Sequence, residues 1–149
     1  MQTLQINPVL QPNFEADAVA DGEEIAVRFS GTADLNAKSM MDGFLMAVHE
    51  EATRLHTRTV NVDISGLEFI NSSCLMAIVT WITGVQAMQR RYQISFHFKS
   101  IRDWHKRSLP VLSQLGAGVV SIKPDPAIKP APADDDQLAV TRVVKGKAR

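Results

Sequence analysis

Hydrophobic residues along the chain follow two different spacings, which predict strands alternating with helices. A period of two, typical of a half-buried strand, runs through residues 24–30, where Ile25, Val27 and Phe29 share one side. Three more short β-rich segments, at residues 59–64, 92–98 and 119–122, predict further strands. The Ser65-Gly66 pair is expected to end the strand at residues 59–64, because both residues favour turns.

Apolar residues at helical spacing follow each of the first three predicted strands. The first helix is expected to start after Asn36, which can cap a helix, and to end near Leu55. The second, predicted to reach about Gln89, has apolar residues at i, i+3, i+4 and i+7: Leu75, Ile78, Val79 and Ile82. The third covers residues 101–115, where Pro110 is expected to cause a kink or a break.

This order of elements predicts an α/β domain with a mostly parallel sheet. Successive strand–helix–strand units are nearly always right-handed, and they place parallel strands beside one another. The pattern alone leaves open whether the helices cover one face of the sheet or both. The first dozen residues, which contain Pro8 and Pro12, are expected to be irregular or an edge strand.

Composition narrows the classes of protein to be considered. The 149 residues are 45% hydrophobic, enough for one domain with a core, and 16 basic residues balance 16 acidic ones. The lack of a basic excess argues against nucleic-acid binding. The sequence contains no run of about 18 apolar residues, so we expect no membrane span. The single cysteine and the absence of a secretory start predict a cytoplasmic protein.

The domain is expected to cover residues 1–122. Residues 123–149 contain four prolines and a run of three aspartates, and they predict a flexible tail. Its apolar patch, residues 138–144, could dock as an added strand on the domain or on a partner.

The residues that could carry catalysis or bind a metal do not form a recognisable set. The four histidines lack metal-ligand spacing, and Cys74, the only cysteine, lies on a helix that must pack. The sequence Gly116-Ala117-Gly118 follows a helix, the reverse of the order found in phosphate-binding loops. We therefore expect no enzymatic activity, no cofactor and no metal.

The most informative sequence is Asn71-Ser72-Ser73, three polar residues between a strand and a helix. One of them is expected to cap the helix. A second interpretation is that one serine displays its hydroxyl at the helix start, where phosphorylation would add roughly −1.5 to −2 charges. Spacing alone does not decide between these interpretations.

Residues 60–82, V-N-V-D-I-S-G-L-E-F-I-N-S-S-C-L-M-A-I-V-T-W-I, resemble the signature of STAS domains, the family of bacterial anti-sigma factor antagonists. The matching residues are Asp63, Ser65, Gly66, Leu67, Phe69, Ser72, Ser73 and Leu75. Residues 27–35 also resemble the family's upstream strand, which ends in G-x-L/A-D. The resemblance implies a mixed sheet of four to five strands with three to four helices packed mainly on one side.

The resemblance also implies a function in signal transduction and transcription regulation, by partner switching. The unphosphorylated domain would bind a serine kinase that acts as an anti-sigma factor, and phosphorylation would release it. By position the phosphoacceptor is Ser72, with Ser73 as the alternative. The residues expected to contact the partner are Asp34, Asn71, Ser72, Ser73, Cys74 and Met76.

Two positions depart from the family pattern. Asn71 stands where the family has an aspartate, so a capping side chain remains but its charge is lost. Cys74 stands where the family has a glycine, which leaves less room for a partner's close approach. The alternative functions are therefore a STAS-like scaffold that is not phosphorylated and a ligand-sensing module. Trp81, on the second helix, could be either an interface anchor or a core residue.

Overall fold

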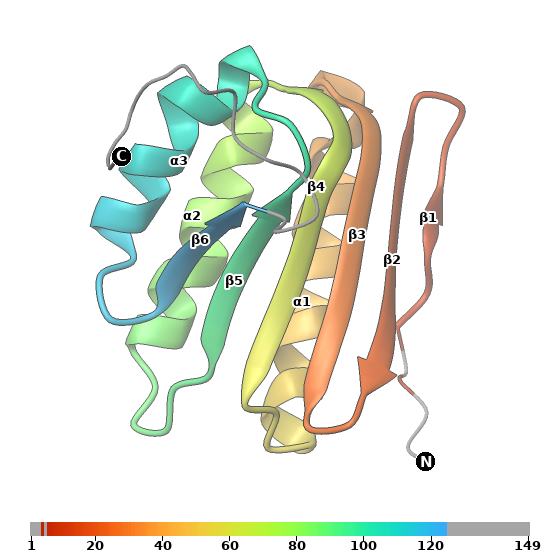
Figure 1. Cartoon of the computed structure of the whole chain (residues 1–149). Coiled ribbons are helices and arrows are strands. Elements are labelled where there is room, and N and C mark those ends of the chain that lie inside the picture. Colours follow the sequence, from red (N-terminus) through yellow and green to blue (C-terminus); the bar gives the residue numbers. More distant parts are fainter. Residues whose placement is uncertain (1–3, 5, 125–149) are drawn as a thin grey trace.

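The computed structural model describes residue 4 and residues 6–124 of the chain (Figure 1). The strands are β1 (Val9–Leu10), β2 (Phe14–Asp21), β3 (Glu24–Ala33), β4 (Thr59–Ile70), β5 (Gln93–Phe98) and β6 (Val120–Pro124). The helices are α1 (Lys38–Arg54), α2 (Ser72–Gln86) and α3 (Asp103–Leu115), with a short 3₁₀ helix, η1 (Leu35–Ala37), before α1. The predicted tail, except for its first two residues in β6, lies outside the described residues.

The six strands form one mixed sheet in chain order, β1 to β6. The β1–β2 and β2–β3 pairs are antiparallel, and β3, β4, β5 and β6 are parallel. Each parallel strand lies beside the previous one, so right-handed crossovers bring all three helices to the same face. Figure 1 shows α1, α2 and α3 behind the sheet. The expected one-sided α/β fold is confirmed, with six strands instead of four or five.

The core lies between the helices and one face of the sheet. Ile25, Val27 and Phe29 of β3 are buried there, as their alternation predicted. The other face is polar: Arg28, Asp63 and His97 are register partners on β3, β4 and β5. A sheet covered on one face alone needs this alternation, because the uncovered side chains meet water.

Strand β4 continues through Ser65-Gly66 to Ile70, so the predicted end of the strand there was wrong. The pairing with β3 shifts register twice, between Arg28 and Ser30 and between Gly31 and Thr32, and it continues to Ile70. From the other side, Arg102 Nη2 donates to the Ser65 carbonyl at 2.8 Å, and Trp104 Nε1 donates to the Leu67 carbonyl at 2.8 Å. These long-range contacts hold the backbone extended, and they carry the chain to the start of α2.

Strand β2 was not predicted. Its sequence, F-E-A-D-A-V-A-D, carries little apolar side-chain volume, so its alternation is weak. The structure supplies a partner instead, because β2 pairs with β3 along its whole length. Gly22, at φ +64°, makes the tight turn between the two strands.

Two helix predictions also need correction. Asn36 does not cap α1; Asp34 Oδ1 accepts a hydrogen bond from the Asn36 backbone N–H at 3.0 Å and so caps η1. Pro110 lies inside α3 without dividing it, and its side chain is exposed. At an exposed site the carbonyl that loses its helical donor can bind water instead.

Candidate functional site

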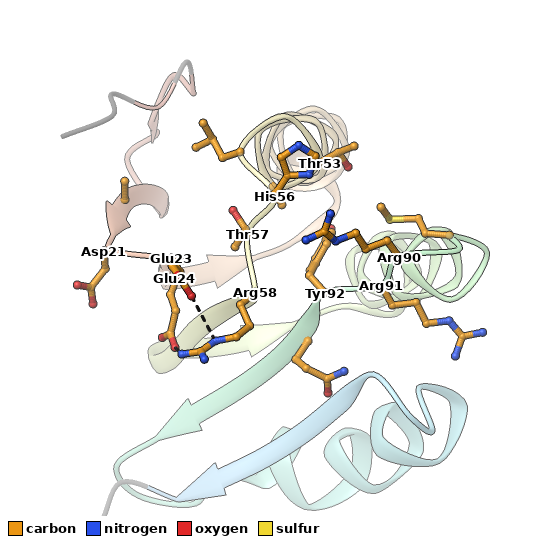
Figure 2. A pocket seen from close by; sticks show the side chains of 16 residues that line it. Asp21, Glu23, Glu24, Thr53, His56, Thr57, Arg58, Arg90, Arg91 and Tyr92 are labelled. Atoms are coloured by element: carbon orange, nitrogen blue, oxygen red, sulfur yellow. Dashed lines mark ion pairs between the residues drawn. The ribbon is translucent and has the colours of Figure 1, made fainter.

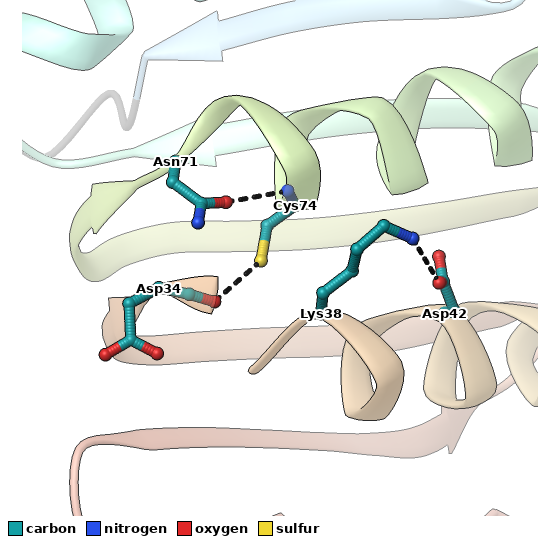
Figure 3. Close-up of polar contacts among 5 residues, drawn as sticks. All are labelled: Asp34, Lys38, Asp42, Asn71 and Cys74. Carbon is teal, nitrogen blue, oxygen red and sulfur yellow. Dashed lines mark hydrogen bonds and ion pairs between the residues drawn. The ribbon is translucent and has the colours of Figure 1, made fainter. Parts of the chain in front are cut away.

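Ser72 lies at the first position of α2, where β4 ends and the chain turns into the helix. The Asn71 backbone N–H donates to the Ala33 carbonyl at 2.9 Å, which ties this turn to the end of β3. Asn71 Oδ1 accepts a hydrogen bond from the Cys74 N–H at 2.8 Å (Figure 3), so Asn71 is the predicted cap. Ser72 is exposed, and its hydroxyl makes no hydrogen bond to any described residue.

The loop between β3 and η1 lies against the first turn of α2. The Cys74 thiol donates to the Asp34 carbonyl at 3.3 Å (Figure 3), which joins segments distant in sequence. Cys74 is completely buried, and burial raises its pKa, as does the nearby Asp34 carboxylate. A buried thiol with a raised pKa is a poor nucleophile. Cys74 therefore supports the site from below, and its expected direct contact with a partner was wrong.

Three large apolar side chains stand exposed on the elements that meet at the start of α2. Leu35 of η1 is 72% exposed, Phe69 of β4 is 45% exposed and Met76 of α2 is 55% exposed. Met76 follows Ser72 by four residues, which puts both on the same side of the helix. We call Leu35, Phe69, Ser72 and Met76 the Ser72 surface. Grouped exposed apolar residues of this kind mark interaction sites.

The charged side chains beside the Ser72 surface carry no positive excess. Lys38 Nζ and Asp42 Oδ2 form an i,i+4 ion pair at 2.6 Å on the first turns of α1 (Figure 3). The Asp34 carboxylate is occupied in capping η1. A surface with apolar side chains and little excess charge favours contact with another protein over contact with a polyanion.

The structure brings most of the residues expected to contact a partner to this one end of the molecule. Asp34 lies in the loop before η1, and Asn71, Ser72, Ser73 and Met76 lie at the start of α2. Leu35 and Phe69 were not among the residues predicted from the sequence to contact a partner. The only sequence feature that could have found them was their place beside the G-T-A-D and I-N-S-S segments.

Trp81 is a core residue, which resolves its two interpretations. It is buried, and its Nε1 donates to the Tyr92 hydroxyl at 2.7 Å. The Tyr92 hydroxyl also lies 2.7 Å from His49 Nδ1 of α1. This network joins α1, α2 and the start of β5 in the core, away from the Ser72 surface.

The histidines lie apart from one another. His49 contacts Tyr92, His97 Nε2 lies 3.0 Å from Asn61 Oδ1, and His105 Nδ1 accepts from the Arg102 N–H. Within residue 4 and residues 6–124, no group of three or more side chains has the arrangement of a metal site. In the same residues, no helix combines the length and apolarity that crossing a bilayer requires.

No family model matches the sequence. No curated protein matches it significantly. The solved structures do give matches. An anti-sigma factor antagonist from Mycobacterium paratuberculosis superimposes with a TM-score of 0.57 at 13% identity, over 76% of this chain and 90% of that one. This chain has the STAS fold.

Two further STAS-fold neighbours support the assignment. The anti-sigma factor antagonist SpoIIAA in its unphosphorylated form gives a TM-score of 0.50 at 14% identity, over 74% of this chain and 86% of that one. The protein TM1081 gives a TM-score of 0.55 at 13% identity, over 85% of this chain and 93% of that one. At such low identity the likeness establishes the fold, and the chemistry of the site must be argued from its own residues.

Proposed function

We propose that this STAS-fold chain is a non-enzymatic regulatory module that binds a serine kinase of the anti-sigma type, and that phosphorylation of Ser72 releases this partner. The observation that carries the proposal is the exposed, unbonded Ser72 hydroxyl, at an end of the molecule where Leu35, Phe69 and Met76 are exposed as well. The structural neighbours that are anti-sigma factor antagonists support a role in protein–protein binding.

The start of α2 suits a phosphate on Ser72. The first amides of a helix have no partner within the helix, and the positive end of the helix dipole favours an anion there. Asn71 satisfies the Cys74 amide, which leaves the Ser72 and Ser73 amides available. Capping by Asn71 also leaves the Ser72 hydroxyl free for phosphoryl transfer. A bonded and inaccessible Ser72 hydroxyl would have favoured the non-phosphorylated scaffold alternative.

The exposed side chains beside Ser72 give a reason why phosphorylation would release a partner. A bound protein would cover Leu35, Phe69 and Met76 and remove water from them. A phosphate on Ser72 would introduce roughly −1.5 to −2 charges into that contact. The partner would then have to bury or approach a strongly hydrated dianion, and this cost favours dissociation.

The experiment combines kinase treatment with two Ser72 variants. The wild-type chain is incubated with a candidate anti-sigma-type serine kinase and ATP, and the modified residue is located by mass spectrometry. Ser72→Ala should bind that kinase as tightly as the wild type and take up no phosphate. Ser72→Asp should bind more weakly by about tenfold, which corresponds to a cost of about 1.4 kcal/mol for a partly buried unpaired charge.

Gln89→Glu is the charge control, because it adds one negative charge at an exposed position beyond the other end of α2. It should leave binding unchanged. Phe69→Ala tests the surface itself and should weaken binding by about tenfold without unfolding the exposed site. Equal binding by both Ser72 variants, together with no phosphate on the wild type, would refute the switch. A normal affinity in Phe69→Ala would refute the proposed contact.

A further inference from the structure

The largest of the described hollows lies at the opposite end of the molecule from Ser72. Its volume is about 1120 Å³, against about 440 and 420 Å³ for two others. Three loops surround it at the amino ends of the parallel strands: residues 21–24, 55–58 and 88–93. We call it the basal pocket (Figure 2). It is large enough to take a small organic molecule.

The charges of the basal pocket are arranged in two walls. Glu23 and Glu24 lie on the β2–β3 hairpin, and Arg58 faces both, with nitrogen–oxygen distances of 4.0 and 3.6 Å. Arg90 and Arg91 lie on the α2–β5 loop across the pocket, and neither forms an ion pair or a side-chain hydrogen bond with a described residue. With Asp21 also on the hairpin, the acidic wall keeps a negative excess over Arg58, and the opposite wall keeps a positive excess.

Arg90 is the arginine directed into the pocket. Figure 2 shows its guanidinium reaching from the α2–β5 loop toward Thr57 and His56, whereas the Arg91 side chain extends the other way. A guanidinium presents several fixed N–H donors that match the oxygens of a phosphate. Arg91 then adds to the positive potential without needing to touch the ligand.

His56 is held at the mouth of the pocket by an unusual backbone conformation. Its φ is +53°, and it is the only non-glycine residue with positive φ in the described part of the chain. It ends α1 in a Schellman motif: the His56 N–H donates to the Thr53 carbonyl, and the Thr57 N–H donates to the Ala52 carbonyl. Glycine fits this position with less strain, so histidine here adds an imidazole to the pocket at a cost in stability.

From this arrangement we infer that the basal pocket binds a small phosphorylated polyol, with its phosphate on Arg90 and His56 and its hydroxyl groups toward the carboxylates of the β2–β3 hairpin. The phosphate accepts hydrogen bonds from the basic wall, and the hydroxyls donate to Asp21 and Glu23. The site is separate from the Ser72 surface, so it stands or fails independently of the proposed function.

Three probes distinguish binding at the basic wall from binding at the acidic wall: ribose 5-phosphate, inorganic phosphate and ribose. Each is titrated into the ¹⁵N-labelled full chain, and amide shifts are followed by NMR. Ribose 5-phosphate should shift residues 56–58 and 88–93 in a saturable way and bind more tightly than inorganic phosphate. Ribose alone should cause no saturable shift. Saturation by ribose as strong as by its phosphate would overturn the phosphate assignment.

Variants then assign the groups. Arg90→Gln should weaken binding of ribose 5-phosphate by about tenfold, the usual effect of losing a charge-assisted contact. Asp21→Asn should weaken the binding of ribose 5-phosphate and leave the binding of inorganic phosphate unchanged. The control, Arg107→Gln, removes an exposed arginine of α3 that does not line the pocket, and it should bind like the wild type.

His56→Gly gives the most specific outcome. It relieves the positive-φ strain, so resistance to urea should hold or rise while phosphate binding weakens. A loss of binding in Arg107→Gln equal to that in Arg90→Gln would show unspecific charge attraction and refute the site. The absence of any saturable shift in residues 56–58 and 88–93 with millimolar ribose 5-phosphate would refute it as well.

Discussion

The two ends of the parallel strands carry opposite kinds of surface. At the carboxyl end of β4, the Ser72 surface displays exposed apolar side chains beside a free hydroxyl. At the amino end, the basal pocket is concave and lined by charged side chains. Another protein can bury side chains that stand out, whereas a small ligand needs a cavity with a few converging polar groups. One sheet therefore presents two surfaces suited to different ligands.

The lengths of the strands explain this difference. At the amino end, Glu24, Thr59 and Gln93 are register partners, so three strands begin level and their loops rise around a hollow. At the other end, β4 pairs with β5 as far as Asp63 but runs on with β3 to Ile70. That extension runs past the last β4–β5 pair, and it carries the chain to Ser72 beyond the end of β5.

Two glycines, one toward each end of β3, allow the largest test of this contrast. Gly31 has φ +90°, and a Cβ there would collide with the Asn13 carbonyl oxygen, whereas at Gly22 a Cβ would meet open space. Gly31→Ala should lower the free energy of unfolding by about 3 kcal/mol, from strain plus displacement of β2. Gly22→Ala should lower it by about 1 kcal/mol. Urea unfolding measures both, and equal losses would contradict the close packing at Gly31.

Protonation of His105 in acid should destabilise the end of the molecule that carries Ser72. Burial, together with the positive charge of Arg102, lowers the pKa of this histidine to about 4. Its Nε2 is buried without a hydrogen-bond partner among the described residues. The unfolded chain has a histidine pKa near 6.5, so protonation favours unfolding: stability is full above about pH 6.5 and falls as the pH drops toward 4.

The expected loss between pH 7 and pH 5 is about 2 kcal/mol, measured by urea unfolding at each pH. His105→Gln should flatten that decrease, because a neutral amide oxygen can still accept from the Arg102 N–H. His49, whose pKa burial also lowers, stays in both proteins and serves as the internal background. Parallel losses in the wild type and the variant would show that His105 is not responsible.

Tyr92→Phe acts on the floor of the basal pocket and should cost about 1–2 kcal/mol in unfolding free energy. It leaves Trp81 Nε1 buried without its acceptor and also removes the contact with His49. A change in Trp81 fluorescence should accompany the loss. Partner binding through the Ser72 surface should stay as in the wild type. A loss of that binding at a temperature where the variant is folded would show that the two ends are coupled.

Asn71 gives the smallest effect. Asn71→Ala removes the cap of the Cys74 amide and should lower the unfolding free energy by about 1 kcal/mol. Asn71→Asp keeps the cap and adds a negative charge at the helix start, which should raise it by about 0.5 kcal/mol. Thermal unfolding at low salt separates the two. Equal destabilisation by both variants would contradict capping by the Asn71 side chain.

Much of the fold could be predicted from local patterns, because each pattern records one kind of burial. The alternation of Ile25, Val27 and Phe29 indicated a strand, and the Asn71 cap was visible as a polar residue before an apolar helix. Strand β2 could not be predicted, since its small side chains carry little hydrophobic signal and its stability comes from pairing with β3. The extension of β4 was missed for the same reason: Ser65-Gly66 favours a turn until β3 and α3 hold it extended.

The site divides in the same way. Ser72 and its neighbours were predicted from the sequence, because a polar run between a strand and a helix stands out locally. The exposure of Leu35 and Phe69, the burial of Cys74 and the position of Trp81 in the core were not predictable. Whether an apolar side chain is exposed or buried depends on what packs against it, and the packing segments can lie far away in the chain.

The amino-acid sequence alone therefore determined the order of the main strands and helices, the polar turn that carries Ser72 and the absence of a large net charge. Only the tertiary structure decided that the helices share one face, that β4 reaches Ile70 and that three distant loops enclose Arg90 and His56. The physical reason is the separation along the sequence of the residues that interact. Spacing and capping act within a few residues, whereas strand pairing and pocket formation join residues that become neighbours only when the chain is folded.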